Sequence, residues 1–111
     1  MIFSGDLCAK VLSGEKTQTR RLKRGYYKVG GVYAVQPGRG KKAVGHIRMK
    51  KMWPNKLGDM SSADVRAEGF DSWQKFMDTF CTLHHLGPCD WPMVWAFEFE
   101  LDMVFPIHGE S

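Results

Sequence analysis

The alternation of residues between Met93 and Leu101 constrains the fold of this chain more than any other feature. Large apolar side chains occupy every second position, and small or acidic side chains occupy most of the positions between them. A period of two residues is typical of a β-strand with one face in a core and the other toward solvent. The first face comprises Trp95, Phe97, Phe99 and Leu101, and the second comprises Ala96, Glu98 and Glu100.

Three helices are predicted from capping signals and from apolar residues at helical spacing. Glycine is a natural helix end, because it adopts the left-handed conformation at little cost. The third helix carries an apolar stripe from Trp73 to Phe80, which we assign to the core. The helices begin at Ser4 or Asp6, at Ser61, and at Asp71 or Ser72, and the first two end at Gly14 and Gly69.

Two further strands are predicted at 32–36 and 43–52, joined as an antiparallel hairpin by a loop with exposed charge. The residues after Gly14 leave a helix and begin an extended segment. The order is therefore helix, strand, hairpin, two helices and strand, which is not the alternation of a βαβ fold. It favours an α+β fold with a small, mainly antiparallel sheet, curled or barrelled, and helices packed at its side.

The chain has 111 residues, which indicates one domain. Its three cysteines do not make a disulfide framework. No apolar run approaches the roughly 18 residues of a membrane-spanning helix, and the first residues lack the pattern of a signal peptide. We therefore expect a cytoplasmic protein that does not bind a membrane.

Positive charge is concentrated in the first half of the chain. Residues 1–56 contain 14 Lys or Arg and 2 Asp or Glu, a net charge of +12, whereas residues 57–111 contain 2 and 10, a net charge of −8. This asymmetry favours a polyanionic partner. The alternative is that the two halves pack together and neutralise each other.

The segment Gly14–Arg21, with the sequence GEKTQTRR, places a lysine, two threonines and two arginines directly after a helix end. Lys16 and Thr19 are three residues apart, so a regular strand would point them to opposite faces. If the chain turns after Gly14, they can form a nucleophile pair, because desolvation and neighbouring cations lower the pKa of a lysine. A neutral lysine then accepts the proton of the threonine. A solvated basic edge is the alternative.

Glu68 lies at the end of the short second helix. A carboxylate there opposes the helix dipole, and such small costs are often found where a group has a task. The alternative is a surface glutamate paired with Arg66 or another cation.

A cluster of cysteine and histidine follows the third helix. Both residue types bind zinc, but the spacing is not that of a standard finger. The alternatives are a buried core cysteine, and a histidine that faces a cleft and contacts a ligand. The cluster comprises Cys81, His84, His85 and Cys89.

Basic residues recur in and beside the predicted hairpin, with aromatic residues nearby. Cations beside aromatic rings suit nucleic acid, because charge meets phosphate and rings stack on bases. A solubilising hairpin is the alternative. The basic residues are Arg39, Lys41, Lys42, Arg48, Lys50 and Lys51, and the aromatic residues are Tyr26, Tyr27 and Trp53.

Three segments together resemble the ASCH domain family, relatives of the PUA RNA-binding domain. Residues 12–21 resemble its leading motif, an apolar residue and a glycine followed by Lys-Thr-x-Thr-x-Arg. Residues 64–70 resemble its second motif, an acidic helix that ends in Glu-Gly-Phe, and residues 94–99 resemble its closing strand. The resemblance covers residues 1–102, which we take as a single domain with a tail at 103–111.

The resemblance implies a PUA-like β-barrel of five to six mostly antiparallel strands, flanked by short helices, with a cleft lined by the first motif. Some small bacterial members hydrolyse the acetyl amide of N4-acetylcytidine. Carried over to this chain, their catalytic set is Lys16, Thr19 and Glu68. Another member is a ribonuclease, so one fold hosts more than one chemistry.

Two departures favour a phosphate-bearing ligand: the doubled Arg20-Arg21, where the amidohydrolases have one arginine after an apolar residue, and the basic first half. The expected ligand is a nucleoside, nucleotide or RNA, with no metal or cofactor. The two main hypotheses are an acylated-nucleoside amidohydrolase and an RNA-binding module or metal-independent ribonuclease; a regulatory nucleotide-binding domain is a third. The predicted phosphate-binding residues are Arg20, Arg21, Arg39, Lys41, Lys42 and Lys50.

Overall fold

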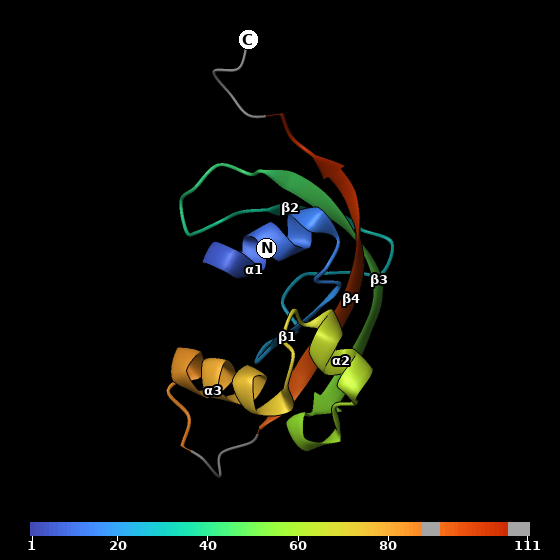
Figure 1. Ribbon diagram of the computed structural model, residues 1–111. Helices are drawn as coiled ribbons and strands as arrows, with labels where there is room; N and C mark the ends of the chain where they lie inside the picture. Colours follow the sequence, from blue (N-terminus) through green and yellow to red (C-terminus); the bar gives the residue numbers. More distant parts are fainter. Residues whose placement is uncertain (88–91, 107–111) are drawn as a thin grey trace.

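The structure of the protein, a computed structural model, describes residues 1–87 and 92–106 (Figure 1). Four strands and three α-helices alternate irregularly along the chain, in the order predicted. No helix within the described ranges combines the length and the apolar character needed to cross a membrane. The elements are α1 (Gly5–Ser13), β1 (Gln18–Arg21), β2 (Val32–Val35), β3 (Gly45–Lys56), the 3-10 turn η1 (Leu57–Asp59), α2 (Ser62–Ala67), α3 (Trp73–His84) and β4 (Met93–Val104).

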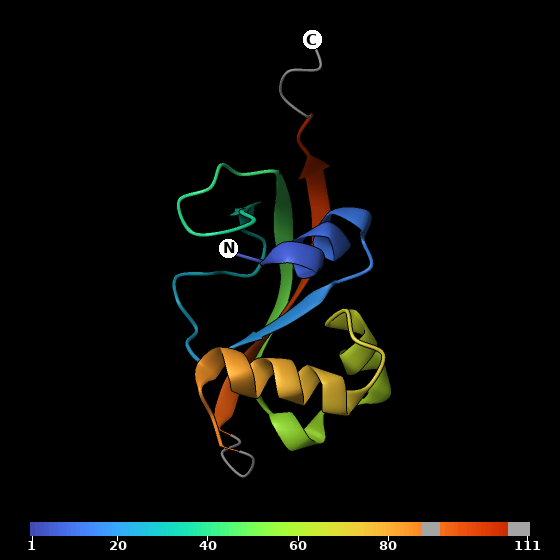
Figure 2. The same cartoon turned by 60° about the vertical axis from the view of Figure 1, so that its left-hand side comes forward.

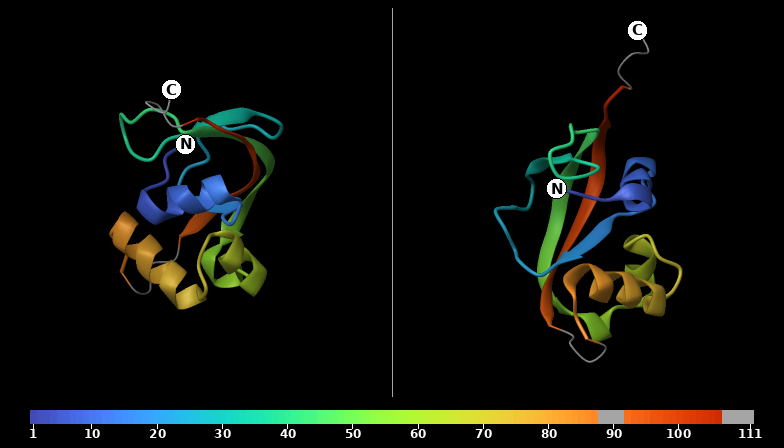
Figure 3. Two further views of the ribbon diagram at one scale, coloured as in Figure 1. Left: turned by 45° about the horizontal axis from the view of Figure 1, so that its top comes forward. Right: turned by 90° about the vertical axis from the view of Figure 1, so that its left-hand side faces the viewer.

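The strands form one antiparallel sheet in the order β1-β4-β3-β2. The long pair β3 and β4 stays in contact from Gly45 opposite Val104 to Lys56 opposite Met93. The pair bends strongly, and its register shifts twice, between His46 and Ile47 and between Met49 and Lys51. Irregularities of this kind increase strand twist, and the sheet curls into a half-barrel with α1 and α3 on its concave side (Figures 1 and 3).

The predicted α+β class and curled antiparallel sheet are confirmed, but a barrel of five to six strands is not. The part of the chain that the structure describes supplies four strands. Near the start of the chain, Ile2 makes a single parallel bridge with Gln36, and Phe3 N donates to the Gln36 carbonyl at 2.9 Å. This segment does not lengthen into a strand, because α1 begins at Gly5.

Strand β3 runs four residues beyond the predicted end at 52 and includes Pro54. A proline lacks the N–H that a central strand must donate. Here the short β2 pairs only with residues 45–48 of β3. At Pro54, β3 is therefore paired with β4 on one side and has no β2 residue on its other side. The proline therefore lies on what is locally an edge, which explains why the strand continues through it.

Most helix ends follow the predicted signals, although Ser4, the N-cap residue of α1, makes no side-chain capping hydrogen bond. Gly14 caps α1 with a φ of +82°, in the left-handed region. Ser61 forms a capping box with Asp64 at the start of α2, and the Ser72 hydroxyl accepts a hydrogen bond from Lys75 N at 3.2 Å at the start of α3. These local signals predicted the helix boundaries because each depends on residues within one turn.

The core has two parts. The larger lies between α1 and the concave face of the sheet and includes Val11, Ile47, Phe97 and Phe99. The smaller joins α3 and η1 to the beginning of β4. Val94 of β4 is buried in this second part, so this end of the strand is covered on both faces and the predicted alternation of buried and exposed residues fails there.

Candidate active site

Lys16 reaches its position through the end of α1. After the left-handed Gly14, the backbone N–H of Lys16 donates to the Lys10 carbonyl at 3.0 Å. The chain therefore makes the turn after Gly14 that the nucleophile pair requires, and Lys16 precedes β1 instead of lying on it. Thr19 lies on β1, opposite Phe97 of β4. Because Lys16 lies outside the strand, the alternation of side chains along a strand does not force Lys16 and Thr19 to opposite faces.

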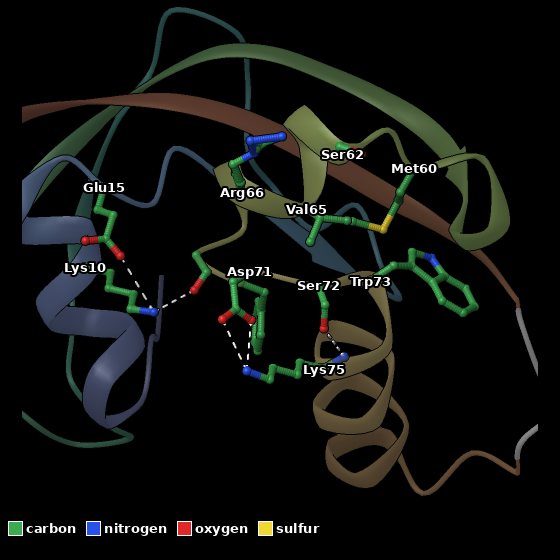
Figure 4. A pocket seen from close by; sticks show the side chains of 12 residues that line it. Lys10, Glu15, Met60, Ser62, Val65, Arg66, Asp71, Ser72, Trp73 and Lys75 are labelled. Carbon is green, nitrogen blue, oxygen red and sulfur yellow. Dashed lines mark hydrogen bonds and ion pairs between the residues drawn. The ribbon is translucent and has the colours of Figure 1, made fainter.

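Glu68 is held at the end of α2 by residues from the first motif and from α1. Three successive main-chain carbonyls accept hydrogen bonds there: Ala67 from Thr17 N at 2.8 Å, Glu68 from Lys16 Nζ at 2.7 Å, and Gly69 from Lys10 Nζ at 2.6 Å. Two ammonium groups thus face the negative end of the helix dipole, which offsets the cost of the carboxylate predicted at this position. Lys10 also reaches toward Glu15 (Figure 4).

The side chains of Lys16, Arg20 and Glu68 form a buried charged cluster, and each residue is at most 3% exposed. Lys16 Nζ lies 2.8 Å from Glu68 Oε1, and Arg20 NH1 lies 3.0 Å from Glu68 Oε2. One carboxylate therefore accepts from two cations. Such charges are stable in an interior only when they are paired and hydrogen-bonded. The surface pairing of Glu68 with Arg66, considered as an alternative, is not what the structure shows.

Arg20 is held by protein partners through Nε and NH1, whereas its buried NH2 makes no hydrogen bond among the described residues. Its Nε donates to Asn55 Oδ1 at 2.8 Å, its NH1 also donates to Gln18 Oε1 at 2.9 Å, and its NH2 lies 3.7 Å from Asp64 Oδ2. The side chain has no exposed surface. Arg20 was predicted to bind phosphate, and that role stays a prediction; the structure places the side chain as a buried partner of Glu68 at the cavity wall.

Burial lowers the pKa of the Lys16 ammonium below that of an ordinary lysine. The neighbouring Glu68 carboxylate acts in the opposite direction, and Arg21 and Arg20 add to the lowering. A lysine in this environment loses its proton more readily and can act as a base.

Thr19 and Arg21 share the other face of β1. Arg21 Nε donates to Thr19 Oγ1 at 3.2 Å, and Arg21 NH2 donates to the Ile2 carbonyl at 2.7 Å. The Arg21 guanidinium also lies over the Phe3 ring, 5.1 Å from its centroid. The threonine hydroxyl is thus oriented by Arg21, and Lys16 takes Glu68 as its partner.

One cavity of about 270 Å³ is lined by the side chains of Lys16, Thr19, Arg20, Arg21 and Glu68. Its lining residues come from the N-terminal segment and α1, and from β1 and α3. Figure 2 shows how these elements are arranged. The size of the cavity is slightly below the roughly 300–1,000 Å³ of typical small-molecule sites, which suits one flat ring and its substituents. The polar groups are those of Lys16, Thr19, Arg20, Arg21, Glu68, Thr79 and His84, and the apolar wall includes Phe3, Leu7, Phe70, Phe76 and Phe80.

A larger hollow of about 860 Å³ is shared by α1, α2 and α3 (Figure 4). Its ion pairs are exposed: Lys75 lies 3.1 Å from Asp71, and Lys10 lies 3.6 Å from Glu15. Pairs of this kind contribute little energy in water. The buried charges face the smaller cavity, so the smaller cavity is the candidate site.

The other predicted phosphate-binding residues lie elsewhere on the surface. Arg39, Lys41 and Lys42 are exposed in the connection between β2 and β3, and Lys50 is exposed on β3. Among the described residues that line the cavity, these four are not found. Arg20 and Arg21 are the two predicted residues that do line it.

The cysteine and histidine cluster is only partly described, because Cys89 lies outside the described residues. Within the ranges 1–87 and 92–106, three or more metal-binding side chains do not gather at any point. His84, at the end of α3, lines the cavity, as the cleft alternative allowed. Burial, followed by the nearby Arg21 and His85, lowers the pKa of the His84 imidazole below its usual value.

Sequence reasoning missed two groups that position the site. Lys10 and Asn55 both bind atoms of the cluster or its supporting backbone. Lys10 reads as an ordinary exposed lysine near the end of an amphipathic helix, and its partner Gly69 lies 59 residues away. No local pattern signals a contact of that range.

The fold and the cavity define a class: a small α+β half-barrel with buried charges at its edge strand. No protein-family model matches the sequence, and no curated protein sequence matches it. Solved structures do share the fold. A DUF984 protein of Enterococcus faecalis aligns with a TM-score of 0.70 at 21% identity, covering 96% of this chain and 76% of its own.

Two further structures are ASCH domain proteins. That of Lactobacillus crispatus aligns with a TM-score of 0.63 at 16% identity, covering 88% of this chain and 71% of its own. That of Zymomonas mobilis aligns with a TM-score of 0.67 at 15% identity, covering 94% and 70%. The chain is therefore similar to ASCH domain proteins and has their fold, as the resemblance predicted.

Proposed function

We propose that the protein binds a nucleoside in this cavity and hydrolyses an acyl amide on its base, as in N4-acetylcytidine. The observation that carries the proposal is the buried Lys16–Glu68 pair, which lines the same cavity as Thr19, a cavity sized for one ring. The similarity to ASCH domain folds supports it. Perturbed, buried titratable groups in a cavity are typical of catalytic sites.

The reaction proceeds in two stages. Thr19 Oγ1 attacks the acyl carbonyl carbon while neutral Lys16 accepts its proton. Arg21, which already donates to this hydroxyl, stabilises the negative charge that develops on the carbonyl oxygen. As the C–N bond breaks, Glu68 relays the proton from Lys16 to the departing amino nitrogen. Water then hydrolyses the acyl ester on Thr19, which releases the carboxylic acid and restores the enzyme.

The test is incubation of the purified protein with N4-acetylcytidine, with cytidine measured by chromatography. Wild type should release cytidine, and Lys16→Ala should not, although circular dichroism should show both folded. Lys75→Ala is a control that removes an exposed lysine from α3 and should keep full activity, because Lys75 pairs with Asp71 outside the cavity. Near-normal turnover by folded Lys16→Ala would remove this mechanism.

A second candidate function is RNA binding, with or without metal-independent cleavage. The observation that favours it is the set of exposed basic residues in the β2–β3 connection and on β3. The sequence from Lys16 to Gly58, which contains them, has no Asp or Glu. Affinity for single-stranded RNA should then fall steeply with salt. Affinity that does not change with salt, or no binding at all, would count against it.

A further inference from the structure

The connection from β1 to β2, residues 22–31, contains a stacked group of tyrosines. The Tyr26 and Tyr27 rings stack with centroids 4.6 Å apart and planes 27° apart. Tyr27 in turn meets the edge of Tyr33 at 4.8 Å and of Phe97 at 5.5 Å. Tyr27 therefore connects the stack to the main core, and Tyr26 is the outermost ring, 71% exposed.

The backbone of this connection is shaped around the rings. Lys28 N donates to the Tyr33 hydroxyl at 2.7 Å. Gly31 lies directly against the Tyr33 ring, where an added Cβ would collide with it, and Gly25, at a φ of +67°, lies under the Tyr27 ring. The exposed Tyr26 ring is thus supported from below by two packed tyrosines, which makes it a preformed surface.

The connection that carries the exposed ring is rich in positive charge. Lys23, Arg24 and Lys28 are exposed in the same connection, and Arg24 lies over the Trp95 ring, 5.7 Å from its centroid. Arg48 of β3 also reaches this connection, where it donates to the Gly30 carbonyl at 3.3 Å. Arg48 also pairs with Asp102 at 3.3 Å.

The connection begins at the candidate site. Arg21, the last residue of β1, lines the cavity together with Leu83 and His84 from the end of α3. Figure 2 and the right-hand view of Figure 3 show the connection leaving the end of β1 beside α3. Phe97, which Tyr27 contacts, is the cross-strand partner of Thr19. The tyrosine stack and the cavity are therefore neighbours along one strand.

We propose that a tyrosine platform, made of Tyr26 on Tyr27 with Lys23, Arg24 and Lys28, binds the nucleotide next to the one in the cavity. The favoured substrate is then a single-stranded nucleic acid. A base stacks on the exposed face of Tyr26, and the lysines and arginine contact the adjoining phosphates. This inference deepens the proposed function and rests on it for the placement of one nucleoside in the cavity.

The test is fluorescence anisotropy with a labelled single-stranded RNA of about ten cytidines, which is longer than a cavity for one nucleoside can hold. Tyr26→Ala should weaken binding about fivefold to 150-fold, the range of base–aromatic stacking. Tyr26→Phe keeps the ring and should bind nearly as wild type. Between about 50 mM and 200 mM salt, Lys23→Ala should reduce the salt slope by about 0.7 for a lost phosphate contact.

Lys75→Ala is the matched control, because it removes the same charge at a distance from the platform. Equal weakening by Lys75→Ala and Lys23→Ala would overturn the proposal, since binding would then depend on net charge alone. Unchanged affinity in Tyr26→Ala, or no binding by wild type at low salt, would also overturn it. Hydrolysis of free N4-acetylcytidine is measured separately, so RNA binding without hydrolysis rejects the proposed function and leaves the platform standing.

Discussion

Glu68→Gln tests the energetic role of the carboxylate that two buried cations share. The substitution keeps the shape of the side chain and removes its charge. Arg20 retains Asn55, Gln18 and Asp64, whereas Lys16 retains only neutral oxygen partners among its contacts at the cluster. A buried charge left without its partner costs about 3–5 kcal/mol. That is a large part of the roughly 5–15 kcal/mol by which domains are stable.

Lys16→Met should behave differently, although it removes the other half of the same pair. Glu68 keeps Arg20 at 3.0 Å, so no charge is stranded. The main loss is the hydrogen bond to the Glu68 carbonyl, on the order of 1 kcal/mol. Because the pKa of Lys16 is lowered on folding, the environment already disfavours its ammonium form. The double variant Lys16→Met/Glu68→Gln should therefore recover most of the stability that Glu68→Gln loses.

The pH dependence has a definite sign. The pKa of Lys16 is lower in the folded state than in the unfolded state, where a lysine has a pKa near 10.4. As pH rises, the folded state therefore releases this proton first. The unfolded state then binds more protons, so the free energy of unfolding increases with pH in that window. The loss of unfolding free energy caused by Glu68→Gln should thus be smaller at about pH 10 than at about pH 7. The loss caused by Lys16→Met should not become smaller in this way, because the titrating group is absent.

The assay is urea unfolding followed by circular dichroism, with linear extrapolation to water at both pH values. The reasoning is refuted if Lys16→Met destabilises as much as Glu68→Gln. It is also refuted if the losses of the two single variants simply add in the double variant, because additivity means that the two groups do not interact.

Three further predictions concern the supports and chemistry of the site. Lys10→Met should lower kcat with little change in KM, because it removes the hydrogen bond to the Gly69 carbonyl beside Glu68. Lys10→Arg should restore much of the rate. Equal kcat in Lys10→Met and wild type would contradict this role. Gly69→Ala should cost about 1–2 kcal/mol in urea unfolding, because φ is +94° and the new Cβ would lie 3.2 Å from Lys10 Cδ. In steady-state assays, kcat/KM should rise with pH through a Lys16 pKa below the ordinary lysine value, and a rate that falls over that range would exclude a lysine base.

Local signals in the sequence predicted much of the fold. The end of α1 at Gly14 and the start of α2 at Ser61 depend on side chains within a turn of the boundary. The β4 alternation predicted Phe97 and Phe99 as core. The first and second motifs, through their resemblance to the ASCH family, indicated residues that the structure brings to one cavity. The roles of those residues stay predictions.

The remainder depends on contacts that no short pattern carries. The adjacent Arg20 and Arg21 were treated alike, yet β1 directs one into a buried ion cluster and the other toward Thr19. Reading residues 18–21 as a strand would have separated them by face. The partner Asn55 lies 35 residues from Arg20, and its contact exists only because β3 and β1 both flank β4.

The most direct test of the account is an NMR titration of the Lys16 side chain, using protein with ¹³C-labelled lysine and Lys16→Met to assign the signal. The account predicts that Lys16 titrates below the ordinary lysine pKa of about 10.4 and that its signal moves when N4-acetylcytidine is added. An ordinary pKa, together with a signal that the nucleoside leaves unchanged, would contradict the claim that Lys16 is the buried base of a nucleoside site.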